Sequence, residues 1–152
     1  ILEGTKIIKL HPNMFYALPI FDAYCNSFKK QNVFSVRSQI NAPLLFSLAD
    51  IIVIDMPTTT LLQAVTCKKP IFCLTCHLNV SKKAGELLKK RVVLSDNPES
   101  LMEQVQEFIA SKKYNADMNN SEFLEYFGTK TDGKAAERAV TALGQLIRGN
   151  RL

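Results

Sequence analysis

The sequence has no tryptophan, only two histidines and only six glycines in 152 residues. The glycines are scattered, which excludes the Gly-rich phosphate loops of dinucleotide-binding folds and P-loop NTPases. No G-x-S-x-G segment is present, so the nucleophile elbow of α/β-hydrolases is excluded. The acidic residues also lack the pairing of a glycosidase dyad. Several common enzyme classes are therefore excluded before any positive signal is considered.

Long apolar runs are also missing, since none reaches the roughly 18 residues that a membrane-spanning helix needs. The first residues contain neither a basic segment followed by an apolar one nor a cleavage site for export. We therefore expect a cytoplasmic location. A chain of 152 residues with 47% hydrophobic and 22% charged residues has the length and composition of one globular domain.

Positive charge is in mild excess, with 19 Lys and Arg against 14 Asp and Glu and a net charge of +5. This balance favours an anionic partner, such as a phosphorylated metabolite or an anionic membrane surface. The bases lie in short clusters without interleaved aromatic residues, so we expect no nucleic-acid partner. Clusters such as residues 89–91 are typical of solvated helix ends, where cations complement the helix dipole.

Strand-like and helix-like segments alternate five times between residues 5 and 110. Short β-branched runs predict strands, and apolar residues at three-and-four spacing predict helices. Asn41, Pro43 and residues 96–98 match the preferences of helix starts. Such alternation predicts an α/β fold with a Rossmann-like parallel sheet flanked by helices. The predicted strands are 5–10, 32–36, 51–55, 70–74 and 91–95, and the predicted helices are 18–30, 41–50, 58–69, 81–90 and 99–112.

The run IIVID at 51–55 lacks alternation of apolar and polar residues, which is typical of a central strand covered on both faces. After a polar break, residues 111–152 contain one or two helices separated by the segment TKTDG. We expect these helices to form an appendage that packs on or beyond the α/β unit.

Three consecutive threonines, Thr58, Thr59 and Thr60, follow the IIVID strand and would begin the next helix. Ligands of open parallel sheets bind at the carboxyl ends of the strands, where helix N-termini present unpaired N–H groups. Those groups favour anions, to which hydroxyls can also donate. One threonine is enough for capping, so three predict a phosphate site. The alternative is a segment that only caps the helix.

His11 occupies the equivalent place after the first predicted strand, in the segment KLHPN. Pro12 biases His11 toward an extended conformation, and an imidazole can donate a hydrogen bond to phosphate. Because we predict both segments at the same sheet edge, His11 is a second candidate for phosphate binding. The alternative is a turn histidine without a ligand.

The segment CLTCH at 73–77 matches the C-x-x-C-H pattern of haem attachment and the C-x-x-C pattern of redox or zinc sites. Haem attachment of this type belongs to exported proteins, and a second pair of zinc ligands is missing because Cys25 and Cys67 are isolated. We therefore predict Cys73 to be a small buried hydrophobic residue of its strand. We expect neither a metal nor a cofactor.

Taken in order, KLHPN, ADIIVIDMPTTTLLQAVTCKKPIFCL and FLEYFGTKTDGKAAERAVTAL resemble the C-terminal, donor-binding half of bacterial GT-B-type transferases. The likeness is to CDP-glycerol glycerophosphotransferase-like and related surface-polysaccharide enzymes, and it covers nearly the whole chain. It implies that residues 1–110 are a Rossmann-like domain that binds the nucleotide donor and lacks its usual first strand and helix. Residues 111–152 would be the C-terminal helices of the GT-B fold.

The resemblance also implies roles for individual residues. The family's His-Pro falls on His11 and Pro12, which are expected at the donor's phosphates. Its hydroxyl-rich turn falls on residues 58–60, which are expected at the same pyrophosphate. Asp55 and Gln63 are implied as contacts to the ribose or another part of the donor. Gln63 stands where many sugar-nucleotide enzymes carry a glutamate, and no catalytic residue is assigned.

The implied function is the donor site of a glycosyl- or glycerophosphoryl-transferase for a cell-surface polysaccharide or a teichoic-acid-like polymer. The donor would be CDP-, CMP- or UDP-linked and bound without a metal. The implied partners are an N-terminal acceptor domain, which often supplies the catalytic base, and an anionic membrane at the cytoplasmic side. Two alternatives stay open, namely a sugar-nucleotide epimerase-like domain and a non-catalytic nucleotide-binding or interaction module.

Overall fold

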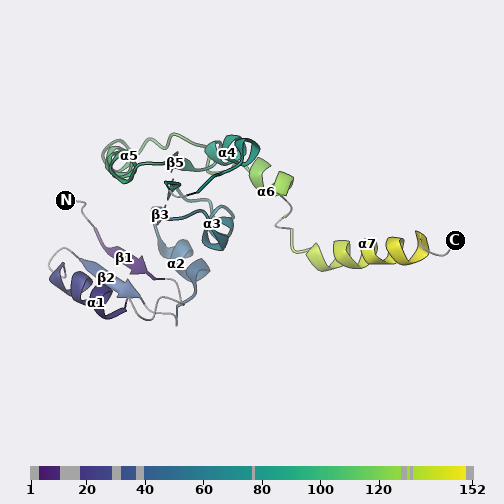
Figure 1. Ribbon diagram of the computed structural model, residues 1–152, viewed down its shortest axis with the longest axis horizontal. Coiled ribbons are helices and arrows are strands. Elements are labelled where there is room, and N and C mark those ends of the chain that lie inside the picture. The colour runs from purple at the N-terminus through teal and green to yellow at the C-terminus, as the bar shows by residue number, and fades with distance from the viewer. Residues whose placement is uncertain are drawn as a thin grey trace.

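A computed structural model of the protein shows an α/β body from which a long helix projects (Figure 1). The residues it describes are 4–10, 18–28, 32–36, 40–76, 78–127, 130 and 132–149. The strands are β1 (Lys6–Lys9), β2 (Val33–Val36), β3 (Ile52–Ile54), β4 (Ile71–Leu74) and β5 (Val93–Ser95). The helices are α1 (Leu18–Ser27), α2 (Ala42–Leu48), α3 (Thr59–Ala64), α4 (Lys82–Lys89), α5 (Pro98–Ser111), α6 (Glu122–Phe127) and α7 (Ala135–Gly149). The predicted alternation of strand and helix from β1 to α5 is confirmed.

Three of the helices begin at side chains that accept a hydrogen bond from the first turn. Asn41, Ser81 and Asn97 each accept from the backbone N–H three residues further on, at 3.0, 3.3 and 2.8 Å. Pro43 and Pro98 lie in the first turns of α2 and α5, where their missing N–H groups are not needed. The starts predicted at Asn41 and Asn97 are therefore confirmed.

Helix α3 is shorter than the predicted 58–69, because it ends at Ala64. Beyond that residue, the Thr66 hydroxyl donates to the Gln63 carbonyl at 2.7 Å, and the Cys67 N–H donates to the Ala64 carbonyl at 2.9 Å. These short-range bonds form a tight turn that replaces further helical bonds.

In the part of the chain that the structure describes, all strand pairs are parallel, which confirms the predicted α/β class. The strands form two sheets, with the orders β1-β2 and β3-β4-β5. In the larger sheet, Ile54 lies opposite Cys73, and Cys73 lies opposite Leu94. Helix α1 packs on β2, where the Ser35 hydroxyl donates to the Asp22 carboxylate at 3.0 Å.

The prediction that residues 51–55 form a central strand covered on both faces is wrong. Among the described strands β3 pairs only with β4, so it is an edge strand. Ile52 and Ile54 are each 4% exposed, whereas Val53, on the opposite face, is 51% exposed. On the face of the sheet that carries Val53, helix α5 covers β4 and β5 but not β3.

The core lies on both faces of the three-stranded sheet. On one face, Ile71 and Cys73 of β4 pack with α2, α3 and α4. On the other, Phe72 packs against α5 and Tyr114, and its ring centroid lies 5.8 Å from those of both Phe108 and Tyr114. Because successive residues of β4 point to opposite faces, this one strand connects the two apolar layers.

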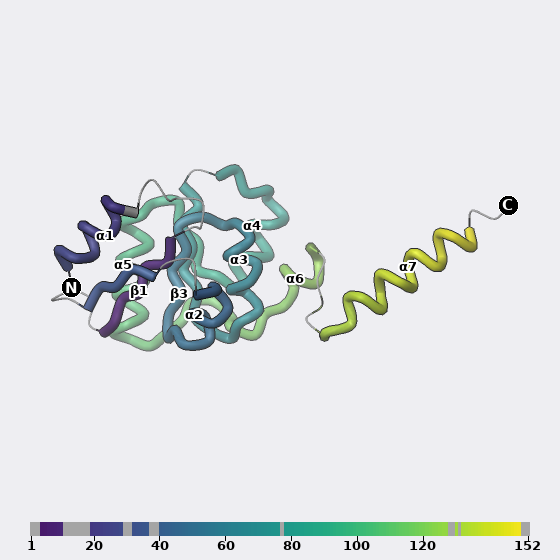
Figure 2. The backbone as a smooth tube through the Cα atoms, turned by 90° about the horizontal axis from the view of Figure 1, so that it is seen from below, coloured from purple at the N-terminus to yellow at the C-terminus, as the bar shows by residue number. Residues whose placement is uncertain are grey.

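The two C-terminal helices differ in how they meet this body. Helix α6 packs on α4 and buries Phe123, and the Lys90 ammonium lies 2.6 Å from the Glu122 carboxylate. Helix α7 buries no residue and extends away from the body in both views (Figures 1 and 2). In the described part of the chain, no helix has the length and apolar character needed to cross a membrane.

Candidate functional site

The predicted phosphate site lies at the carboxyl end of β3, where the chain turns into α3. Thr58 occupies the N-cap position, and its carbonyl accepts from Leu61 N–H at 2.9 Å and Leu62 N–H at 3.3 Å. Its own N–H donates back to the Met56 carbonyl at 2.9 Å. The start of α3 therefore follows the carboxyl end of β3 within a short turn.

The threonine side chains are not used by the helix itself. Thr58 makes no side-chain capping bond, although one threonine was expected to do so. Within the part of the chain that the structure describes, the hydroxyls of Thr58, Thr59 and Thr60 have no hydrogen-bond partner. Thr58 and Thr59 are exposed, and Thr60 is partly exposed. Three hydroxyls and the N–H groups of Thr59 and Thr60 are thus uncommitted donors for an anion, whereas Leu61 N–H is bonded to the Thr58 carbonyl.

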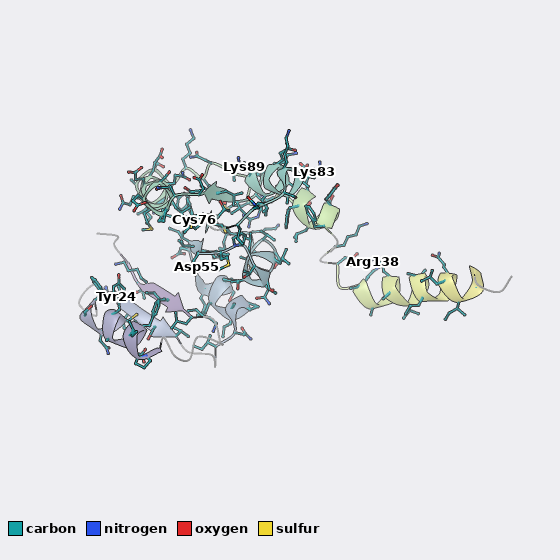
Figure 3. All side chains as sticks on the ribbon, in the orientation of Figure 1. Tyr24, Asp55, Cys76, Lys83, Lys89 and Arg138 are labelled. Atoms are coloured by element: carbon teal, nitrogen blue, oxygen red, sulfur yellow. The ribbon has the colours of Figure 1, made fainter. Side chains whose placement is uncertain are left out.

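Asp55 and Gln63 are both exposed and flank the threonines in sequence. Gln63 lies one turn after Thr59 and Thr60 on α3, so the three share one side of the helix. Asp55 follows β3 directly and lies within the body of the molecule (Figure 3). Its charge contributes to the raised pKa of the neighbouring Cys73 thiol. A carboxylate at this place would repel a phosphate, so Asp55 is better suited to accept a hydrogen bond from a hydroxyl group.

The other strand ends of this sheet offer fewer accessible groups. The N–H and hydroxyl of Thr75, after β4, both donate to the Ser95 carbonyl, at 2.8 and 3.2 Å. After β5, the Asn97 side chain caps α5. These polar groups tie β4 to β5 and begin a helix, so among the described residues after β3, β4 and β5 the uncommitted hydroxyl donors are concentrated at α3.

His11 and Pro12, the other predicted phosphate contacts, lie outside the described residues. The strand that precedes them, β1, pairs with β2 in the smaller sheet. The expectation that His11 and the threonines follow strands of one sheet is therefore wrong, because β1 and β3 belong to different sheets. The role of His11 in phosphate binding stays a prediction.

Cys73 has the buried, structural character predicted for it. Cys73 is fully buried in β4, and burial, followed by the charge of Asp55, raises the pKa of its thiol to about 12. Cys76 is partly exposed, and the four cysteines form no disulfide. Among the described residues, no three His, Cys, Asp or Glu side chains are grouped as metal ligands.

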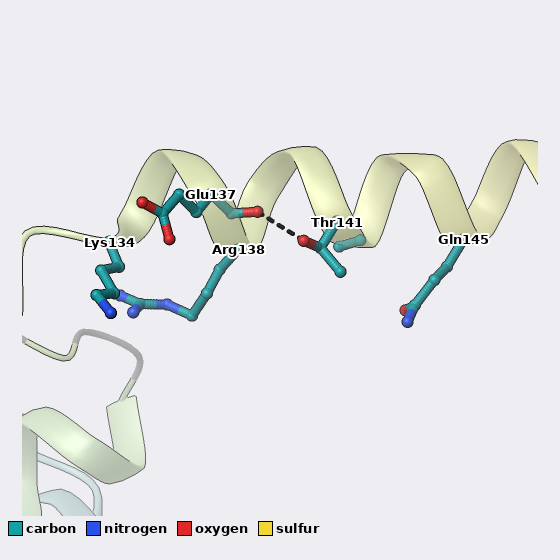
Figure 4. A pocket seen from close by; sticks show the side chains of 6 residues that line it. Lys134, Glu137, Arg138, Thr141 and Gln145 are labelled. Atoms are coloured by element: carbon teal, nitrogen blue, oxygen red, sulfur yellow. Dashed lines mark hydrogen bonds between the residues drawn. The ribbon is translucent and has the colours of Figure 1, made fainter.

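A shallow depression on α7 is a poor candidate for a ligand site (Figure 4). Its lining comes from α7 and the residue that precedes it, so no second element encloses it. The Thr141 hydroxyl, which lies in it, donates to the Glu137 carbonyl of the same helix at 2.8 Å. The lining residues are Lys134, Glu137, Arg138, Thr141, Ala142 and Gln145.

Sequence patterns missed a polar cluster at the amino ends of β4 and β5. Arg91 is 1% exposed, so the prediction of a solvated helix end at 89–91 is wrong at this residue. The Arg91 guanidinium donates a hydrogen bond to the Cys67 carbonyl in the turn after α3. Burial lowers the pKa of Arg91. Lys89 is exposed as predicted, and so is Lys83 (Figure 3). No local signal distinguishes Arg91 from the lysines beside it.

No family model, no curated protein and no solved structure matches this chain.

Proposed function

We propose that this chain is the donor-nucleotide-binding part of a glycosyl- or glycerophosphoryl-transferase. The enzyme would act in the synthesis of a bacterial cell-surface polysaccharide or a teichoic-acid-like polymer. The observation that carries the proposal is the start of α3, where Thr58, Thr59 and Thr60 present three uncommitted hydroxyls at the carboxyl end of a parallel strand. This arrangement supplies several donors to one anionic group without requiring a metal.

In the proposed site the threonine hydroxyls and the first N–H groups of α3 donate to the phosphates of a CDP-, CMP- or UDP-linked donor. Charge that develops on the leaving nucleotide phosphate is stabilised by donors already in place. The Gln63 amide and the Asp55 carboxylate bond hydroxyls of the ribose or the transferred group. His11 and Pro12 complete the phosphate contacts in this proposal.

The net charge of +5 supports an anionic ligand. The proposal includes two partners suggested by the family resemblance. An N-terminal acceptor domain would supply the catalytic base, and the inner face of a membrane would hold the growing polymer at the cytoplasmic side. This chain by itself would bind the donor without turning it over.

Isothermal titration with CDP, CMP and UDP tests the proposal. Replacing all three threonines by valine keeps their shape and removes three donors, and each hydrogen bond to a charged group contributes about 1.5 to 3 kcal/mol. We expect saturable binding by the wild type and a loss of at least tenfold in affinity in the triple variant. Thr66→Val, at the other end of α3, is the matched control and should bind as the wild type does.

Two results would contradict the proposal. One is the absence of binding by the wild type at millimolar nucleotide. The other is equal affinity of the wild type and the triple variant, which would place the nucleotide elsewhere. Either result would favour an interaction module, which the uncovered surface of α7 already makes the second candidate.

A further inference from the structure

Arg91 is a buried cation whose hydrogen bonding is incomplete. It is 1% exposed, and in the part of the chain that the structure describes its Nε and Nη1 atoms have no hydrogen-bond partner. The third nitrogen, Nη2, donates to the Cys67 carbonyl. Burying a guanidinium is costly unless an anion or several acceptors compensate its charge. An undercompensated positive charge therefore lies beside the turn that contains Cys67.

Three ionisable side chains act on this guanidinium. Burial lowers the pKa of Arg91, and the charges of Tyr114, Cys67 and Asp117 oppose that effect. The Tyr114 hydroxyl already bonds the carbonyls of Ile71 and Arg91. Asp117 is exposed, so water screens its carboxylate. The side chain of Cys67 is the third group, and in its neutral thiol form it supplies no negative charge to Arg91.

The Cys67 thiol is accessible and only weakly held. Cys67 is partly exposed, whereas Cys25 and Cys73 are buried. The Cys67 Sγ lies 3.9 Å from the Gln63 carbonyl oxygen, which is a long contact for a weak S–H donor. A reactive cysteine needs access to solvent together with a nearby cation that favours the thiolate. Cys67 has both, while the two buried cysteines lack access.

We propose that Cys67 is a site of reversible oxidation by hydrogen peroxide, with Arg91 as the positioning residue that stabilises its thiolate. The thiolate sulfur attacks one peroxide oxygen, so that an S–O bond forms and the O–O bond breaks. Sulfur is oxidised by two electrons to a sulfenic acid, and the peroxide is reduced. The second oxygen leaves as hydroxide, which takes up the proton released by the thiol and becomes water.

Oxidation also matches the incomplete hydrogen bonding of Arg91. An ionised sulfenate at Cys67 would offer an anionic oxygen beside the guanidinium, and N–H groups of a cation donate more strongly to an anion than to a neutral acceptor. Sulfenic acids are reduced again by thiols, so the modification is reversible. The oxidised form thus gains an acceptor that the reduced form does not provide.

Labelling of the full chain with hydrogen peroxide and dimedone, which traps sulfenic acids, tests the proposal when each cysteine peptide is measured by mass spectrometry. We expect Cys67 to be labelled about tenfold faster than Cys76, which is also partly exposed. In urea the effect of Arg91 is lost, and Cys67 should slow to the rate of Cys76. A cysteine that is merely accessible reacts faster after unfolding, so this comparison separates activation from exposure. Labelling of Cys67 that is no faster in the folded protein than in urea would overturn the proposal.

A substitution of Arg91 tests its role separately. Arg91→Met keeps an unbranched side chain and removes the charge, so it should slow labelling of folded Cys67 about tenfold. Lys89→Met removes an exposed positive charge from the same segment and should leave the rate unchanged. Circular dichroism establishes that both variants fold. A folded Arg91→Met variant with the wild-type rate would contradict the role of Arg91, and if this variant does not fold, the comparison of folded and unfolded wild type decides.

Discussion

At the scale of single residues, Tyr114 holds together segments far apart in the sequence. Its hydroxyl lies 2.9 Å from the Ile71 carbonyl and 2.8 Å from the Arg91 carbonyl, and it accepts from Ile71 N–H at 3.1 Å. Its ring packs edge-on against Phe72 and Phe108. Tyr114 therefore connects the start of β4, the approach to β5 and the segment after α5.

Tyr114→Phe should destabilise the protein by about 1 to 3 kcal/mol, because it keeps the ring but leaves part-buried backbone groups without a partner. Urea unfolding followed by circular dichroism measures this loss.

Tyr126→Phe is the control, because Tyr126 is 62% exposed and its loss of a hydroxyl should change stability by less than about 0.5 kcal/mol. Equal stability of the Tyr114 variant and the control variant would show that the hydroxyl bonds contribute nothing.

Residue roles were predictable where they depend on neighbours in the sequence. The capping of α2 and α5 and the burial of Cys73 follow from local patterns. The burial of Arg91 does not, because it depends on the Cys67 carbonyl, which lies 24 positions away in the chain. For the same reason the sequence did not indicate Tyr114 as a connecting residue.

At the scale of elements, the order of strands and helices was predictable and the pairing of strands was not. The spacing of apolar residues and the positions of turn residues depend only on short stretches of sequence, so they indicate β1 through α5 in the correct order. Pairing between β1 and β3 is a property of distant segments, and the structure places these strands in different sheets. Val53 is consequently exposed, although its sequence is typical of a central strand.

Helix α6 is held to the body partly by the ion pair between Lys90 and Glu122. The hydrogen bond from Lys90 is the main cause that lowers the pKa of Glu122 below its ordinary value of 4.5. A carboxylate with a lowered pKa in the folded state stabilises the protein above its unfolded pKa. That contribution is lost as the pH falls through the folded pKa.

Glu122→Gln should therefore reduce stability slightly at about pH 6 and have less effect at an acidic pH below the lowered folded pKa, where the carboxylate is protonated. Urea unfolding of both proteins at the two pH values measures the difference. The exposed Glu103 on α5 supplies the control variant Glu103→Gln. A destabilisation by Glu122→Gln that is the same at both pH values would show that the ion pair does not stabilise the docking of α6.

At the scale of the whole molecule, the body and α7 differ in what they expose. The body presents the donors of Thr58, Thr59 and Thr60 at one end of a parallel sheet, and α7 carries an apolar stripe away from it (Figure 1). The amphipathic pattern of α7 was predictable from the spacing of its apolar residues. Their exposure was not, because an amphipathic pattern does not identify the surface that covers it. The threonine segment was predictable as a helix start with more hydroxyls than capping needs, but the missing capping bond of Thr58 was not.

A titration of ¹⁵N-labelled protein with CDP, followed by amide chemical shifts, tests the proposed donor-phosphate site directly. We expect the amides of Thr58, Thr59 and Thr60 to shift most and to saturate together. Shifts confined to exposed lysines such as Lys83 and Lys89, without saturation, would indicate non-specific attraction of an anion to a basic protein. That result, or the absence of any shift at millimolar CDP, would contradict a donor-phosphate site at the start of α3.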